Sequence, residues 1–145
     1  MANERKNKLL QSGDLDVYWN TTNNQFEDEL LAIRIPLLKG LIGWRIMLVH
    51  KDQAETLASV TNIKQLQKYI AGQGRDWDDT KILEFNKFNV TGITHKNSIM
   101  EMLERKRIDY YPRSIMEIWS DLDVFETNNI VVDQSMAFYY PLPVY

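Results

Sequence analysis

The stretch Gly43-Trp44-Arg45-Ile46-Met47-Leu48-Val49 decides the fold class, because it is the strongest strand candidate in the chain. After it, strand-like and helix-like segments alternate at short spacing, which predicts a mostly parallel sheet covered by helices on both faces. Further strands are expected at residues 69–71, 88–90, 107–111, 130–132 and 136–140. We expect Pro112 to end the third of these, since proline cannot donate to a ladder. The expected fold is therefore an α/β three-layer sandwich.

Helices are expected between these strands. Apolar residues at Ile115, Ile118, Trp119 and Leu122 follow the i, i+3, i+4, i+7 spacing of an amphipathic helix, with Glu117, Ser120 and Asp121 facing away from the apolar stripe. Similar patterns predict helices at residues 63–70, 77–85 and 99–103. This regular part defines a domain at residues 43–145.

Residues 1–42 precede that pattern. A helix is expected at residues 3–11, where Gly13 provides a stop signal. Alternation predicts strands at residues 15–19 and 31–36, although few neighbouring strands are encoded for them. We interpret residues 1–42 as the remnant of a first lobe and the crossover to the regular domain.

Composition excludes several classes of protein. The chain has 145 residues, 44% of them hydrophobic, so it can bury a core. Its 17 basic and 20 acidic residues give a net charge of -3, which argues against a general nucleic-acid binder. The longest apolar stretch, residues 35–49, is interrupted by charges and glycines and is too short to insert into a membrane.

Catalytic and metal-binding motifs are missing. There is no cysteine, and His50 and His95 lie too far apart in sequence to form a helical metal pair. No Gly-x-Ser-x-Gly elbow occurs, and the acidic run at residues 76–79 lacks the glycine and glutamate of a calcium loop. We predict no enzyme, no metal and no cofactor. If the chain were an enzyme, Asp76 and His95 would be the only acid and base pair that the sequence offers.

Four segments are expected where α/β sheets present ligands, at the carboxyl ends of strands. They are residues 72–77, 91–95, 111–114 and 139–141. Arg113 could clamp a ligand carboxylate bidentately, or it could pair with Glu117 at i+4. Trp77 could stack on a ligand or cover the sheet, and packing is favoured. Asp76 is expected to cap the following helix rather than contact a ligand.

The order of these segments resembles a known family, the type 2 periplasmic solute-binding proteins of ABC transporters for amino acids. The resemblance is carried by Arg34-Ile35-Pro36-Leu37 and Gly43-Trp44-Arg45-Ile46, then by Gly72-Gln73-Gly74, Ile108-Asp109-Tyr110-Tyr111 and Tyr139-Tyr140-Pro141. It implies the second lobe with its crossover strands, and ligand contacts at residues 74–77 and 111–113. The chain departs from the family at Gly74-Arg75-Asp76, where a Gly-Ser or Gly-Thr pair is typical.

The expected function is non-catalytic binding of a small polar or amino-acid-like solute. The alternative is a protein interaction or structural module that has lost ligand capture. The candidate ligand-binding residues are Gly74, Arg75, Asp76, Trp77, Thr94, Tyr111, Arg113 and Tyr140.

Two further expectations concern partners and compartment. Because most of a first lobe is not encoded, exposed apolar residues between positions 15 and 36 predict a homodimer, perhaps with exchanged segments. No apolar stretch precedes Leu9, so a secretory signal is not expected and the chain as written is cytoplasmic, although the resembled family is periplasmic.

Overall fold

The structure is a computed structural model that describes residues 3–145. These residues form two compact units. Unit 1 runs up to Gly43 and includes Tyr140–Tyr145, and unit 2 is Trp44–Tyr139. Each unit is described by itself.

Unit 2 is built on a five-stranded sheet with the order β3-β2-β4-β1-β5. The strands are β1 (Trp44–His50), β2 (Ile70–Gly74), β3 (Asn89–Ile93), β4 (Tyr110–Ser114) and β5 (Ile130–Tyr139). β2 is parallel to β3 and β4, whereas β1 is antiparallel to β4 and β5. Four strands thus run in one direction and β1 in the other. The carboxyl ends of β2, β3 and β4 lie together at one end of the strands, beside the start of β1. We call this end the carboxyl edge of the sheet.

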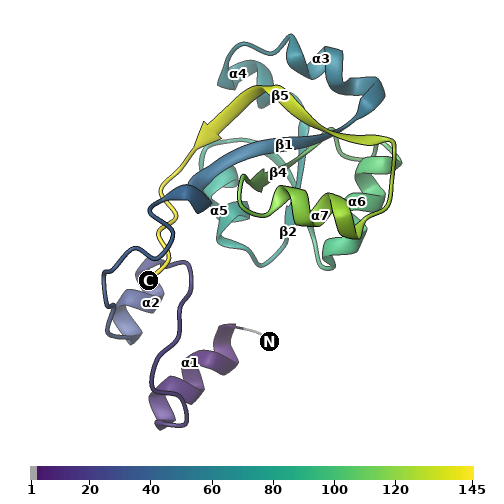
Figure 1. Cartoon of the computed structure of the whole chain (residues 1–145). Helices are drawn as coiled ribbons and strands as arrows, with labels where there is room; N and C mark the ends of the chain where they lie inside the picture. Colours follow the sequence, from purple (N-terminus) through teal and green to yellow (C-terminus); the bar gives the residue numbers. More distant parts are fainter. Residues whose placement is uncertain (1–2) are drawn as a thin grey trace. The chain divides into compact units, whose positions relative to one another are not determined.

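Helices cover both faces of this sheet, so the predicted α/β sandwich with a mostly parallel sheet is confirmed (Figure 1). They are α3 (Ala54–Ala58), α4 (Ile63–Leu66), α5 (Asp78–Phe85), α6 (Lys96–Glu104) and α7 (Ile118–Val124), with a 3-10 turn η2 at Lys51–Gln53. Successive strand residues alternate between two cores. Leu48 and Tyr111 pack with α6 and α7, while Met47 and Tyr110 pack with α3, α4 and α5.

Two strand predictions were wrong in their bounds. β4 continues through Pro112, which lies opposite Met47 of β1. The β2–β4 ladder pairs only Ala71 with Tyr110, so the missing N–H of Pro112 removes little from it. The side-chain amide of Gln73 on β2 donates a hydrogen bond to the Pro112 carbonyl at 3.3 Å. The two strands expected after residue 130 form one strand, β5. Its register shifts opposite Ile46 and Met47, and this irregularity accounts for the break in the sequence pattern.

Unit 1 contains α1 (Asn3–Ser12), α2 (Asn24–Glu29) and the 3-10 turn η1 (Leu41–Gly43). The last residues of the chain hold it together: Asn20 and Tyr145 exchange backbone hydrogen bonds at 3.1 and 3.3 Å. The helix expected at residues 3–11 is confirmed by α1. The strands expected at residues 15–19 and 31–36 are wrong, because neither segment has a partner strand among the described residues.

No helix in residues 3–145 combines the length and the apolar character needed to cross a bilayer.

Candidate ligand site at the carboxyl edge of the sheet

Six charged side chains gather where β2, β3 and β4 end and the next helices begin. We call this set the edge cluster: Arg45, Asp79, Lys96, Arg113, Glu117 and Asp121. β1 and β4 supply the arginines, α5 and α6 supply one residue each from their first turns, and α7 begins directly after Glu117. The short connections from strand to helix therefore bring three cations and three carboxylates together.

Arg113 is buried, with 6% of its surface exposed. Its Nε donates to Asp121 Oδ2 at 2.6 Å, and its Nη2 lies 3.2 Å from Glu117 Oε1. Burial acts against the charged guanidinium, but the carboxylates of Glu117 and Asp121 raise the pKa of Arg113 above its ordinary value. Arg113 therefore stays charged, and the pairing with Glu117 that we weighed against a ligand clamp is present.

Asp121 is the most buried carboxylate of the cluster and contacts two of its cations. It is 4% exposed and contacts both Arg113 Nε and Lys96 Nζ. The expectation that Asp121 faces away from the core was wrong. The apolar stripe indicates only which face of the helix meets the hydrophobic core, whereas Asp121 turns toward the two cations.

Arg45 forms the second arm of the cluster. It is 2% exposed, and its Nη2 lies 2.7 Å from Asp79 Oδ1. Its Nη1 lies 3.8 Å from Glu117 Oε2. Glu117 thus bridges the two buried arginines, one through each carboxylate oxygen.

Two aromatic rings enclose the Arg113 guanidinium. Arg113 Cζ lies 5.2 Å from the Trp77 ring centroid and 5.4 Å from that of Tyr111, within the range of cation–π attraction. The Trp77 ring lies directly over Gly74, where an added Cβ would come within 2.3 Å of ring carbons. Trp77 therefore packs on the end of β2, as favoured from the sequence, and at the same time contacts Arg113.

The Tyr111 hydroxyl is buried and has no hydrogen-bond partner within residues 3–145. Burial raises the pKa of Tyr111, so the phenol is neutral at ordinary pH. Tyr111 therefore contributes an aromatic face to the site and no charge.

The candidate residues from the sequence fall into three groups. Gly74, Trp77, Tyr111 and Arg113 lie together at the edge cluster. The other candidates of unit 2 are exposed, and they are Arg75, Asp76 and Thr94. Tyr140 is buried in unit 1.

The expected helix cap at Asp76 was wrong. The residue at the N-cap of α5 is Trp77, and it makes no side-chain capping bond. The helix begins one residue later than a cap at Asp76 requires, because Trp77 is held in an extended conformation over Gly74.

Sequence reasoning missed Arg45, Asp79, Lys96 and Asp121 as members of the site. One signal was available for Asp121. Glu117 and Asp121 lie four residues apart on the predicted helix and so share a helix face, and Glu117 is the partner considered for Arg113 from the sequence. The contributions of Arg45 and Lys96 depend on sheet order and could not be read from local spacing.

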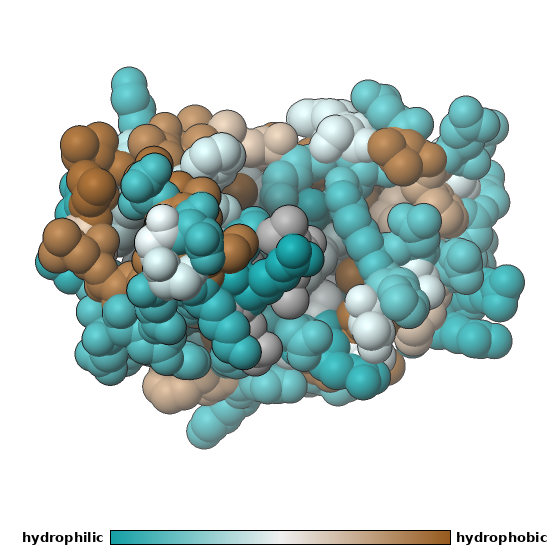
Figure 2. All heavy atoms as spheres, turned by 90° about the horizontal axis from the view of Figure 1, so that it is seen from below, coloured by the Kyte–Doolittle hydropathy of each residue, from teal (hydrophilic) through white to brown (hydrophobic). Residues whose placement is uncertain are grey.

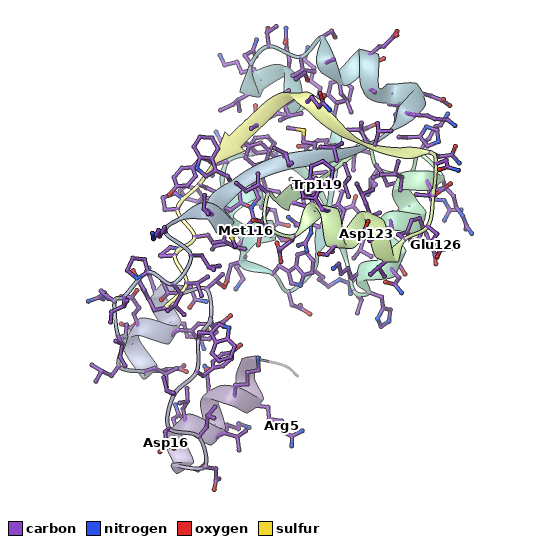
Figure 3. All side chains as sticks on the ribbon, in the orientation of Figure 1. Arg5, Asp16, Met116, Trp119, Asp123 and Glu126 are labelled. Atoms are coloured by element: carbon purple, nitrogen blue, oxygen red, sulfur yellow. The ribbon has the colours of Figure 1, made fainter. Side chains whose placement is uncertain are left out.

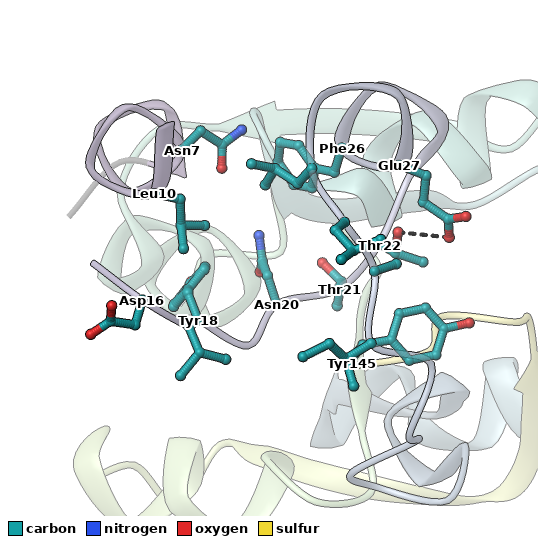
Figure 4. Close-up of a pocket in the computed structure, with 15 residues that line it drawn as sticks. Asn7, Leu10, Asp16, Tyr18, Asn20, Thr21, Thr22, Phe26, Glu27 and Tyr145 are labelled. Carbon is teal, nitrogen blue, oxygen red and sulfur yellow. Dashed lines mark hydrogen bonds between the residues drawn. The ribbon is translucent and has the colours of Figure 1, made fainter. Parts of the chain in front are cut away.

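Unit 1 holds a separate cavity of about 280 Å³ (Figure 4). Its lining mixes apolar side chains such as Leu10, Val17 and Phe26 with polar ones such as Asn7 and Asn20. The Thr22 hydroxyl donates to Glu27 at 3.0 Å on its wall. None of the residues predicted for ligand binding lines this cavity.

The described residues contain no group of three or more histidines, aspartates or glutamates placed to hold a metal ion. The carboxylates of the edge cluster face cations of the chain itself.

The fold of this chain is similar to that of solved periplasmic solute-binding domains. Among solved structures, the chain is similar to the periplasmic VFT2 domain of BvgS from Bordetella pertussis, with a TM-score of 0.69 and 12% identity over 97% of this chain and 57% of that chain. It is also similar to an ABC transporter binding component from Wolinella succinogenes complexed with lysine, with a TM-score of 0.72 and 12% identity over 99% and 61%. An ancestral arginine-binding protein bound to arginine matches with a TM-score of 0.62 and 12% identity over 99% and 63%.

The chain spans 57%, 61% and 63% of the lengths of these three structures. At such identities the likeness concerns the fold. No protein-family model matches the sequence. No curated protein matches it either.

Proposed function

We propose that the chain binds a small polar, amino-acid-like solute at the edge cluster and breaks no bond in it. The observation that carries the proposal is the buried, charged Arg113 held between Trp77 and Tyr111 at the carboxyl edge of the sheet. α/β folds bind ligands at such an edge. A guanidinium there recognises a carboxylate, and the neighbouring aromatic faces shield the contact from water.

The comparisons support the same class of ligand. Structures with this fold were solved with arginine, glutamate and lysine bound. Those ligands belong to the proteins of those structures, and at 8 to 12% identity the side chains that bind them do not carry over to this chain. Amino acids are therefore the first panel to test here.

A thermal-shift screen against the twenty amino acids tests the proposal. A ligand present at about 100 times its dissociation constant adds about 2.7 kcal/mol to the free energy of unfolding. We expect at least one panel member to raise the melting temperature. Failure of every amino acid, at concentrations up to the solubility limit, would contradict the proposal.

Matched variants locate the site. Arg75 and Arg105 are both exposed arginines of unit 2, and only Arg75 lies in the turn that follows β2. We expect Arg75→Ala to weaken the ligand-induced shift and Arg105→Ala to leave it unchanged. Equal effects would mean that the ligand does not contact the turn after β2.

A second candidate function, a protein interaction module, is favoured by one observation in unit 1. Large apolar side chains are exposed along two extended segments, with Leu31 at 94% and Trp19 at 66%. In Figure 2, hydrophobic atoms gather along the left side of the face drawn. No backbone N–H of residues 16–19 or 31–34 donates a hydrogen bond to another described residue. We infer that two chains pair through residues 15–36.

A further inference from the structure

We propose that Glu117 is a resident carboxylate that occupies the anion position between Arg45 and Arg113, and that a ligand carboxylate binds by displacing it. This inference rests on the proposed solute-binding function and concerns the control of the same site. It assigns Glu117 as a competitor for the ligand rather than as one of its contacts.

The distances distinguish Glu117 from the other two carboxylates of the edge cluster. Asp79 and Asp121 lie 2.7 and 2.6 Å from their arginine nitrogens. Glu117 lies 3.2 Å from Arg113 and 3.8 Å from Arg45, so it is the loosest partner of both. Each arginine therefore keeps a tighter carboxylate when Glu117 leaves.

Exposure distinguishes it as well. The side chains of Asp79 and Asp121 are 12% and 2% exposed, whereas that of Glu117 is 38% exposed. Moving a carboxylate of either aspartate would leave a buried cation without its closest partner. The Glu117 carboxylate can rotate into water about its own side-chain bonds while the α7 backbone stays in place, so its displacement costs least.

Charge counting shows what the displacement leaves behind. The cluster holds Arg45, Arg113 and Lys96 against Asp79, Asp121 and Glu117, and Lys96 already contacts Asp121. When Glu117 turns away, two guanidinium groups from different strands face one vacated position. That position suits an external carboxylate, because guanidinium groups bind carboxylates through several parallel hydrogen bonds.

The competition has a direct consequence for affinity. With Glu117 in place, a ligand carboxylate meets a like charge at the position it needs, and its measured affinity is reduced by the free energy of displacing that charge. An amide at position 117 removes the like charge and keeps the shape of the side chain. Such a variant should bind carboxylates more tightly than the wild-type chain.

The experiment compares acetate binding by the full chain and by Glu117→Gln. The readout is the NMR shift of the arginine Nε–H groups during a sodium acetate titration at constant ionic strength. We expect Glu117→Gln to bind acetate about tenfold more tightly than the wild type, since it removes a neighbouring like charge. Glu101→Gln, the same charge change on the exposed face of α6, should match the wild type.

Glu117→Asp is the second variant, because it keeps the charge but withdraws the carboxylate from both arginines, and it should bind acetate with intermediate affinity. Equal acetate affinity in the wild type, Glu117→Gln and Glu101→Gln would overturn the inference while leaving the proposed function standing if a panel amino acid still binds. Weaker binding by Glu117→Gln would overturn it too, by making Glu117 a ligand contact. Tighter acetate binding without any amino-acid binding would refute the proposed function alone.

Discussion

Asp121 is the single side chain on which the edge cluster depends most. It is buried and contacts both Arg113 and Lys96. Asp121→Asn removes the charge and leaves the buried guanidinium short of a carboxylate. We expect a loss of about 3–5 kcal/mol in the free energy of unfolding, measured by urea titration.

Asp123→Asn is the matched control on the same helix (Figure 3). Asp123 is exposed, and exposed charges contribute about 0–1 kcal/mol at most. If the two variants unfold at the same urea concentration, the cluster does not stabilise the fold in the way its geometry indicates.

Gly74 is required because the Trp77 ring leaves no room for a side chain, and not because of its backbone angles. An alanine Cβ there would lie 2.3 Å from carbons of the Trp77 ring, while at Gly92 the nearest atom would be 3.3 Å away. We expect Gly74→Ala to lower the free energy of unfolding by about 1–3 kcal/mol, because the ring must move. Gly92→Ala should cost less in the same measurement. The reverse order would show that Trp77 does not lie over β2.

At the scale of elements, Glu104 links the end of α6 to the loop before β5. Its Oε1 accepts hydrogen bonds from Asn129 Nδ2 at 2.7 Å and Thr127 Oγ1 at 3.0 Å. These bonds, first that of Asn129 and then that of Thr127, lower the pKa of Glu104 below its usual 4.5. Because the pKa of Glu104 is lower in the folded chain than in the unfolded chain, the carboxylate stabilises the fold at pH values above the unfolded-state pKa. This stabilisation is lost as the pH falls through the folded-state pKa.

Glu104→Gln tests this link. We expect it to lower the urea midpoint at pH 7 and to narrow the difference between the midpoints at pH 7 and pH 3. Glu101→Gln, on the same helix and exposed, should keep the wild-type pH dependence. Identical pH profiles for the two variants would show that the Glu104 carboxylate gains nothing from the loop.

The elements of unit 2 could be predicted because their signals are local. β1 is a nearly continuous apolar stretch that is buried along most of its length, α6 buries Ile99 and Leu103 of its expected apolar face, and the structure confirms both elements. Local signals failed where the outcome depends on a distant neighbour. Pro112 was expected to end its strand, but the β2 ladder is nearly finished there. Residues 15–19 and 31–36 have the strand pattern but lack a partner, so pattern alone could not make them strands.

The candidate site shows the same division. Gly74, Trp77, Tyr111 and Arg113 were found because they lie near the carboxyl ends of strands expected from the sequence. Arg45 joins them only because β1 runs antiparallel beside β4, pairing Arg45 with Ser114. Sequence reasoning could therefore find which segments face the edge, but the charge balance of the site required the sheet order.

At the scale of the whole molecule, the exposed apolar segments of unit 1 predict self-association. Leaving a large apolar side chain in water costs about 1.5–3 kcal/mol relative to burying it, so pairing two chains gains substantial free energy. We expect light scattering at high micromolar concentration to show a dimer. A strict monomer at that concentration would contradict the pairing.

A double variant, Leu31→Asp with Ile33→Asp, should shift the dimer toward monomer. Phe85→Asp is the control, because Phe85 is 86% exposed but lies on α5 of unit 2. If Phe85→Asp separates the chains and the double variant does not, the interface lies on unit 2.

The register of β1 and β5 bears on how unit 2 could be transplanted. Its first and last residues, Trp44 and Tyr139, are paired across adjacent strands, and their rings lie 5.3 Å apart. A segment that starts and finishes at neighbouring positions can be spliced into a surface loop of a host protein without stretching either. Residues 44–139 are therefore suited to serve as an insertable cassette, which would carry the complete edge cluster into its host.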